Sequence, residues 1–338
     1  MTDWNVSAAA AALHRDALVW DMTLPWRDYG APELRSATLP RMAAHGVGFV
    51  SLTLAADWSG VPETAHKIAK ERAWFQARGD RYVLVEGVDD IERAQREGKL
   101  AVGFHFQGSN PLNYDVNLVE VYYQLGVRHM LLAYNSRNAT GDGCNERTDG
   151  GLSRFGISVV EEMNRVGMLI DGTHCGYRTT MGLFEASRDP VILSHVNARA
   201  LWEHRRNVRD DQIKACAASG GVIGVSGVGI FLGDNDVSAA RVVDHIDHIA
   251  GLAGPEHVGL GLDYVYDQDA LTRGHNTRPA WNPDEAAFGN TRREDVRYFP
   301  PEHLPRLTEA LLARNYAESE VRGILGGNWL RVARRVWR

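Results

Sequence analysis

The length, composition and charge of the chain restrict both its architecture and its partners. Its 338 residues are 44% hydrophobic and 24% charged, which is typical of a soluble globular protein with one large or two ordinary domains. The formal net charge of -6 gives no basic field for a nucleic-acid backbone, because basic residues cluster only around Arg205 and Arg206. Three cysteines without paired spacing predict reduced thiols in the cytoplasm, and the absence of any apolar run near ~18 residues predicts no membrane span.

Short apolar strands alternate with amphipathic helices along the chain. The eight predicted strands lie at 17–20, 47–54, 100–106, 129–134, 168–171, 191–194, 222–228 and 258–262, and a ninth at 82–85 is interpreted as peripheral. Between them are helices such as 157–167, where Ile157, Val160 and Met163 share one face and Gly167 ends the helix. Strands that are apolar throughout indicate a parallel sheet covered on both faces.

This alternation predicts the fold class. Eight βα units in a chain of this length favour a single (β/α)8 barrel domain over residues 1–338. A doubly wound sheet is the alternative, but no Gly-x-Gly-x-x-Gly loop is present to favour it. The polar, proline-rich segment 266–303 follows the last strand without clear periodicity, and we interpret it as a lid or a dimer contact.

Polar side chains are concentrated where the predicted strands end, which is where barrel enzymes place their chemistry. They are Asp21, Thr23, His105, Gln107, Tyr134, Asn135, His174, His195 and Asp263. Two histidines and an aspartate, with further oxygen and nitrogen donors at one mouth, indicate a metal site of the zinc type. For His105, a buried structural role is the favoured interpretation over that of an extra ligand.

Each of these residues also has a structural interpretation. A histidine at a strand end, such as His174 or His195, is often simply hydrogen-bonded, Asp263 could cap the following helix, and Tyr134 could pack in the core. A nucleophile and base pair formed by Ser194 and His195 is disfavoured, because adjacent residues of a strand are expected to point to opposite faces.

Longer motifs carry a family resemblance. They are the run YNSRNATGDGCNERTDGGLSRFGISVVEEMNRVGMLIDGTHCG with PVILSHVNARAL, RRNVRDDQI, VGLGLDY and ILGGNWLR. These motifs resemble the membrane (renal) dipeptidase family, peptidase family M19 of the amidohydrolase superfamily, and the resemblance extends from residue 18 to 337. It implies a zinc-dependent (β/α)8 hydrolase that cleaves dipeptides, usually with two metal ions, and that forms a homodimer.

The resemblance also implies roles for four residues in the second half of the chain. His174 and His195 match the two histidines that bind the second metal. Asp263 matches the carboxylate that deprotonates the attacking water, and Arg206 matches the arginine that binds the terminal carboxylate of the substrate.

The first half departs from the family pattern at the residues that bind the first metal. Asp21 and Thr23 stand where the family has histidine and aspartate, and Gln107 replaces the glutamate that bridges both metals. Tyr134 replaces a histidine that supports the tetrahedral intermediate. An amide oxygen is neutral, so Gln107 offsets little of the repulsion between two dications.

The remaining charges favour one metal ion. Asp21 and Asp263 balance one Zn²⁺, so we predict one zinc per chain, with two ions as the alternative. The predicted ligands are His174 and His195, completed by Gln107 or Asp21.

The predicted reaction is hydrolysis of a dipeptide or a similar small carboxylate-bearing amide by metal-activated water. Asp263 is the predicted base and Tyr134 the oxyanion donor, while Arg206 and Asn135 are predicted to bind the substrate. One alternative is a related reaction on an N-acyl or N-formyl amino acid, and another is a non-catalytic ligand-binding barrel. We expect a cytoplasmic homodimer with no nucleic-acid or membrane partner.

Overall fold

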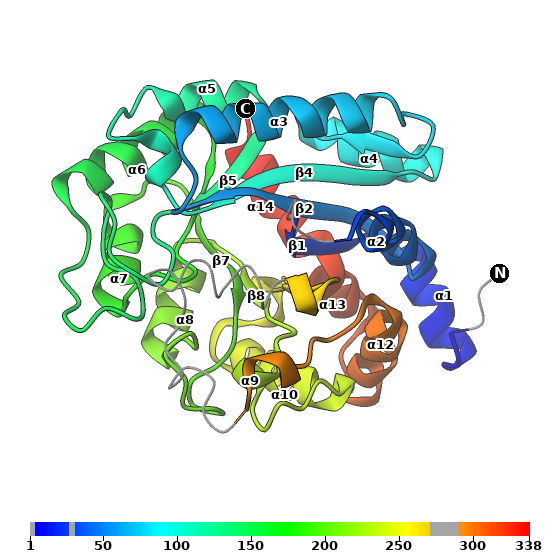
Figure 1. Ribbon diagram of the computed structural model, residues 1–338. Coiled ribbons are helices and arrows are strands. Elements are labelled where there is room, and N and C mark those ends of the chain that lie inside the picture. The colour runs from blue at the N-terminus through cyan, green and yellow to red at the C-terminus, as the bar shows by residue number, and fades with distance from the viewer. Residues whose placement is uncertain (1–3, 27–30, 271–290) are drawn as a thin grey trace.

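Parallel strands form a closed barrel in the computed structural model, which describes residues 4–26, 31–270 and 291–338 (Figure 1). The described strands are β1 (Val19–Pro25), β2 (Val47–Ala56), β3 (Tyr82–Leu84), β4 (Leu100–Gln107), β5 (Val127–Leu131), β6 (Leu169–Asp171), β7 (Val191–Val196), β8 (Ile223–Val225) and β9 (Val258–Leu260). Their order is β2-β1-β9-β8-β7-β6-β5-β4-β3, and pairing of β2 with β4 closes eight of them into a ring. The predicted (β/α)8 barrel is confirmed, and β3 is the peripheral strand.

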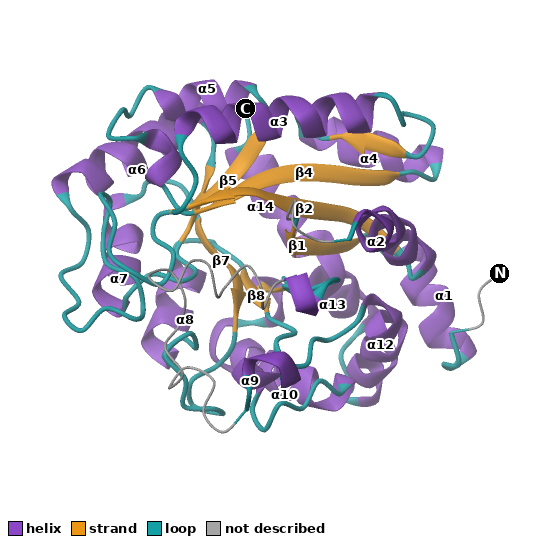
Figure 2. Ribbon diagram, viewed as in Figure 1, coloured by secondary structure: helices purple, strands orange, loops and turns teal. Residues whose placement is uncertain are grey.

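Helices surround the barrel on its outer side (Figure 2). The described α-helices are α1 (Ala8–Asp16), α2 (Pro32–Ala44), α3 (Val61–Gln76), α4 (Val88–Glu97), α5 (Leu118–Gln124), α6 (Arg154–Val166), α7 (Tyr177–Ala186), α8 (Asp210–Ala218), α9 (Gly229–Leu232), α10 (Ala239–Ala253), α12 (Leu304–Ala313), α13 (Glu318–Arg322) and α14 (Asn328–Val336). Among the described residues, no helix has the length and apolarity needed to cross a bilayer.

The helix α6 shows how local sequence sets the ends of an element. The Ser153 hydroxyl accepts a hydrogen bond from the Gly156 N–H at 2.9 Å and caps the start, and Gly167 ends the helix with a φ of 86°. Val160 and Met163 are buried as predicted, but the side chain of Ile157 is 42% exposed. The prediction for Ile157 is wrong because the helix begins at Arg154 and turns its 159–160–163 side toward the barrel.

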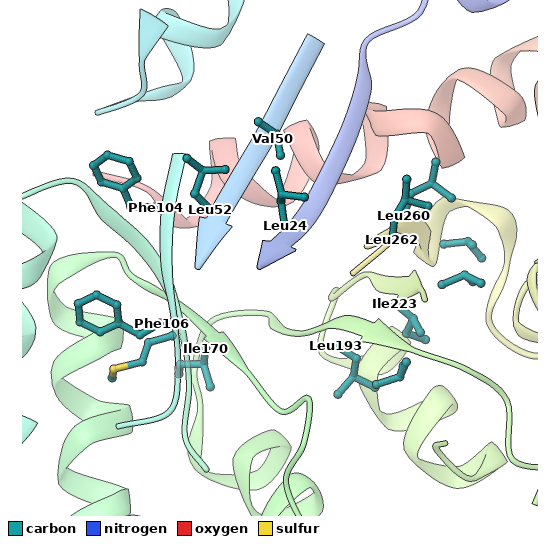
Figure 3. Close-up of a cluster of buried hydrophobic side chains, with 14 of the residues drawn as sticks. Leu24, Val50, Leu52, Phe104, Phe106, Ile170, Leu193, Ile223, Leu260 and Leu262 are labelled. Carbon is teal, nitrogen blue, oxygen red and sulfur yellow. The ribbon is translucent and has the colours of Figure 1, made fainter. Parts of the chain in front are cut away.

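The core lies in two layers. Apolar side chains from strands all around the barrel pack in the main cluster (Figure 3), including Leu24, Val50, Leu52, Phe104, Phe106, Ile170, Leu193, Ile223, Leu260 and Leu262. A second cluster joins the starts of the strands to α14. In it, the rings of Trp20 and Phe49 are 4.0 Å apart, and Trp329 of α14 donates its indole N–H to the Leu260 carbonyl. This apolar layer fills the amino-terminal end of the barrel, so polar chemistry is left to the carboxyl ends of the strands.

The predicted lid or dimer-contact segment, 266–303, is described only at its two ends, because 271–290 lie outside the described residues. Its returning end is fastened to the barrel beyond β8. The Phe299 N–H donates to the Gly227 carbonyl at 2.8 Å, and the Phe299 side chain is fully buried. The role of the segment stays a prediction.

Candidate active site

Two histidines meet at the carboxyl end of the barrel. His195 lies within β7, and His174 lies three residues beyond the end of β6 with a left-handed φ of 67°. Their Nε2 atoms are 3.1 Å apart, and both side chains are buried. The structure therefore brings together the two residues that the sequence predicts as metal ligands.

The Nδ1 atom of each histidine is held by a side-chain oxygen. His174 Nδ1 is 2.6 Å from Asn135 Oδ1, while His195 Nδ1 is 2.8 Å from Ser194 Oγ and 3.1 Å from Thr23 Oγ1. Because an amide oxygen only accepts, His174 Nδ1 carries the proton and its Nε2 presents a lone pair. Burial, then the charges of Arg206 and His129, hold the pKa of His195 well below its usual range, so His195 is neutral at physiological pH.

The geometry of this pair fits two ligands of one zinc ion. Two nitrogens that are each 2.0–2.1 Å from zinc lie about 3.3–3.4 Å apart at a tetrahedral angle, close to the observed 3.1 Å between the Nε2 atoms. Metal-binding histidines usually have their other ring nitrogen hydrogen-bonded, as both have here. Among the described residues, no three His, Cys, Asp or Glu side chains are arranged as a metal site, so Asp21 would have to move toward the histidine pair to act as a third ligand.

Gln107 and Asp21 are the two predicted ligands whose buried polar atoms are unsatisfied. Gln107 ends β4, and its Nε2 has no hydrogen-bond partner. Asp21 lies inside β1, not after it as predicted, and its Oδ1 accepts from the Leu262 N–H at 2.8 Å while Oδ2 has no partner. Burial and, to a smaller extent, the charge of Asp263 raise the pKa of Asp21 to about 7. Neither residue is hydrogen-bonded to the histidine pair in the described chain. The unpartnered Oδ2 of Asp21 suits a bound cation, whereas the unpartnered atom of Gln107 is an N–H donor and does not.

Thr23 connects the predicted base to the histidines. Asp263 follows β9 with a φ of 54°, and its N–H donates to the Thr23 carbonyl at 3.1 Å. The Thr23 hydroxyl is in turn 3.1 Å from His195 Nδ1. The partly exposed Asp263 is thereby placed at the same end of the barrel as the histidine pair.

Tyr134 and Asn135 both contact His174. The Tyr134 ring stacks on the imidazole with 4.1 Å between centroids, and the Tyr134 N–H donates to the buried Asp57 carboxylate at 2.7 Å. Asn135 is hydrogen-bonded to His174, and its predicted role in binding substrate stays a prediction. The left-handed φ of 60° at Asn135 brings its side chain to His174, and no sequence pattern predicted this contact.

The expectation that Ser194 and His195 point to opposite faces is wrong, because Ser194 Oγ lies 2.8 Å from His195 Nδ1. The pairing of β7 with β8 shifts register between Leu193 and Val196, which breaks the strict alternation of side chains. Ser194 is completely buried and its N–H donates to Asp171, so it orients the imidazole.

His105 has the structural role that the sequence favours. Its Nδ1 is 2.9 Å from Ser51 Oγ, its Nε2 is 2.9 Å from Thr53 Oγ1, and its ring stacks on His129. Both ring nitrogens are therefore occupied within the barrel.

A pocket with a volume of about 170 Å³ opens beside His174. Arg206 lines it with only 6% exposure, donates from Nη2 to the His195 carbonyl at 3.2 Å, and lies over the Phe231 ring. Its Nε has no hydrogen-bond partner. Arg206 is thus next to the histidine pair, and its role in binding a substrate carboxylate stays a prediction. The pocket also includes Cys144, whose N–H donates to the His174 carbonyl. Three further arginines line it, Arg199, Arg205 and Arg209, and no sequence pattern predicted that they would meet there.

Comparison with known proteins decides the family. The model of the membrane dipeptidase family, peptidase family M19, matches residues 10–274. The chain belongs to this family.

Relatives of this M19 protein have dipeptidase names but are longer. An uncharacterized dipeptidase of Schizosaccharomyces pombe is 33% identical over 257 residues, which cover 74% of this chain and 56% of that protein. A dipeptidase of Clonostachys rogersoniana is 28% identical over 279 residues, which cover 82% of this chain and 66% of that protein. The chain thus spans between about half and two thirds of the length of these relatives.

Solved structures share the fold. An amidohydrolase from Pseudomonas aeruginosa is 31% identical with a TM-score of 0.85, covering 97% of this chain and 99% of that one. A metallopeptidase from Rhodobacter sphaeroides, solved with a phosphinate mimic of the dipeptide L-Ala-D-Ala, is 20% identical with a TM-score of 0.77, covering 95% and 99%.

Proposed function

We propose that this M19 protein is a metal-dependent hydrolase that cleaves a dipeptide or a similar small carboxylate-bearing amide. The observation that carries the proposal is the buried pair His174 and His195, whose Nε2 atoms converge at 3.1 Å while each Nδ1 is held by a side-chain oxygen. Family membership supports the reaction class. The buried Arg206 beside this pair supports a substrate with a carboxylate.

His174 and His195 would hold one zinc ion, with Gln107 or Asp21 completing the set. Zinc supplies Lewis-acid activation of water and of the amide carbonyl. The neutral His195 and the unpartnered Oδ2 of Asp21 suit this role, because a ligand must offer a lone pair.

The chain's own residues then move the proton and hold the substrate. Asp263 accepts a proton from the attacking water and delivers it to the leaving amine as the amide C–N bond breaks. The hydroxyl of Tyr134, whose ring lies against His174, donates a hydrogen bond to the oxyanion that develops on the carbonyl. Arg206 binds the carboxylate of the leaving amino acid bidentately.

The test combines metal content with activity. Protein purified without chelator is analysed by elemental mass spectrometry, and zinc-loaded protein is assayed with dipeptides and with N-acyl and N-formyl amino acids. The proposal predicts about one zinc per chain, lost in His195→Ala and retained in the control His248→Asn, a histidine on α10 that bonds to Asp210. Hydrolysis of N-acyl or N-formyl amino acids alone favours the related reaction. Zinc without any hydrolysis favours the ligand-binding barrel, and no zinc even after its addition overturns the metal site. The homodimer and the cytoplasmic location remain predictions.

A further inference from the structure

The pocket beside His174 contains more basic groups than one substrate carboxylate requires. Four arginines line it: Arg199, Arg205, Arg206 and Arg209. Arg199 is neutralised, since its Nε donates to the Glu203 carboxylate at 2.8 Å. In the described chain, the guanidinium nitrogens of the other three have no carboxylate oxygen within 4.0 Å, so these three arginines form no ion pair there. Three guanidinium groups therefore remain available to anions.

The two carboxylates that also line the pocket form no ion pair with these arginines, although Oδ1 of Asp149 has no hydrogen-bond partner. Glu146 accepts a hydrogen bond from the Arg137 N–H at 2.7 Å, and Asp149 accepts one from the Arg178 N–H at 2.6 Å. These contacts fix them to their own loops. They screen the arginines in part but do not pair with them.

The three available arginines occupy an inner and an outer position. Arg206 is buried and bonded to the His195 carbonyl, whereas Arg205 and Arg209 are exposed. The Arg209 guanidinium lies 4.8 Å from the centre of the Tyr177 ring, which orients it over the pocket wall. Arg205 and Arg206 are adjacent in the chain and line the same pocket as Cys144.

We propose, on the basis of the dipeptidase-like function above, that the preferred substrate ends in an acidic amino acid. Its α-carboxylate binds Arg206, and its side-chain carboxylate binds Arg205 and Arg209. A planar guanidinium takes a carboxylate through two parallel hydrogen bonds, which an amide of the same shape reproduces poorly. The discrimination is therefore between glutamate and glutamine at the leaving position.

The experiment compares kcat/KM for matched dipeptides that end in glutamate or glutamine, in both L and D forms, after glycine, alanine or leucine. Wild-type zinc-loaded protein is expected to prefer glutamate by about tenfold, the size of one charge-assisted hydrogen bond. The preference should shrink as salt is raised, because the outer arginines are exposed. In Arg205→Gln/Arg209→Gln the ratio is expected to fall toward one. Arg199→Gln is the matched control and should keep the wild-type ratio, since its charge is already paired with Glu203.

The outcomes separate the two proposals. Hydrolysis of both members of each pair with equal efficiency overturns the acidic preference and leaves the dipeptidase function standing. A preference that persists in the double variant also overturns it. Absence of hydrolysis of every dipeptide by zinc-loaded, folded protein overturns the dipeptidase reaction on which this inference rests and, with it, this inference.

Discussion

The hydrogen bond from His174 to Asn135 is expected to set the metal affinity of the site. Asn135 has a left-handed φ of 60°, a conformation that glycine adopts readily and alanine does not. Asn135→Gly therefore removes the acceptor with little backbone strain. Asn135→Asp keeps an oxygen at the same position, and aspartate also tolerates this conformation.

The size of the effect follows from the burial of the contact. The N···O distance is 2.6 Å and His174 is only 6% exposed, so the variant leaves a buried N–H without its acceptor. Such a group costs about 1–3 kcal/mol, and loss of a hydrogen bond to a metal ligand typically weakens metal binding by about 10–100-fold. The Cys144 sulfur, 3.5 Å from the same oxygen, is a weak acceptor and compensates little. We therefore expect Asn135→Gly to weaken zinc binding by an amount in the upper half of this 10–100-fold range.

Competition with a fluorescent zinc chelator at neutral pH measures this affinity. Asn135→Gly should bind zinc much more weakly than wild type, and Asn135→Asp at least as tightly, because a carboxylate makes the imidazole a more basic ligand. Thermal unfolding of the zinc-free proteins checks that each variant folds. Unchanged affinity in Asn135→Gly would refute the reasoning. Equal losses in both variants would show that the loop, not the acceptor, is what matters.

Three further variants test other parts of the site. Asp263→Asn should retain its zinc by elemental analysis while kcat falls about 10²–10⁴-fold, and unchanged turnover would remove Asp263 from the mechanism. Arg206→Ala should raise KM for a dipeptide with a free carboxylate more than for its terminal amide, and equal increases would count against carboxylate binding. Burial raises the pKa of Asp57 to about 6, so the native state binds this proton more tightly than the unfolded chain does. Proton binding at Asp57 therefore contributes to the free energy of unfolding below about pH 4. This contribution, on the order of 3 kcal/mol, is lost as the pH rises through about 6. Urea unfolding of Asp57→Asn across this range should lack that loss, although the variant is less stable because its amide faces donors from Tyr134 and Asn138.

The barrel is readable from the sequence because its strands are covered on both sides. Continuous apolar runs gave the strands to within a few residues, and the weak run at 82–85 was correctly set apart as β3. The main error is at β1, which continues to Pro25 through Asp21 and Thr23. A polar residue after an apolar run resembles a strand end, yet a polar residue can lie inside a barrel strand when neighbouring strands supply partners, as the Leu262 N–H does for Asp21.

The site is only partly readable, because its precision comes from irregular backbone. The convergence of His174 and His195 follows from parallel strands whose carboxyl ends meet at one edge. The contact of Ser194 with His195 depends on a register shift, and the approach of Asn135 depends on a left-handed residue in a loop. The four arginines of the pocket lie in the segment 199–209, which follows β7. This segment has no hydrophobic periodicity from which its conformation could be predicted.

Thr23 offers the strongest structural argument for one metal ion over two. By the family resemblance it matches an aspartate ligand of the first metal, and its hydroxyl lies 3.1 Å from Nδ1 of His195. A threonine there cannot neutralise a dication, but it can orient an imidazole that binds one at Nε2. Asp21 has one oxygen occupied by backbone N–H groups, and Gln107 is neutral, so these two residues together offer a single unpartnered carboxylate oxygen, Oδ2 of Asp21. That inventory suits the support of one ion bound by His174 and His195, and the two-metal alternative would require two dications to share it.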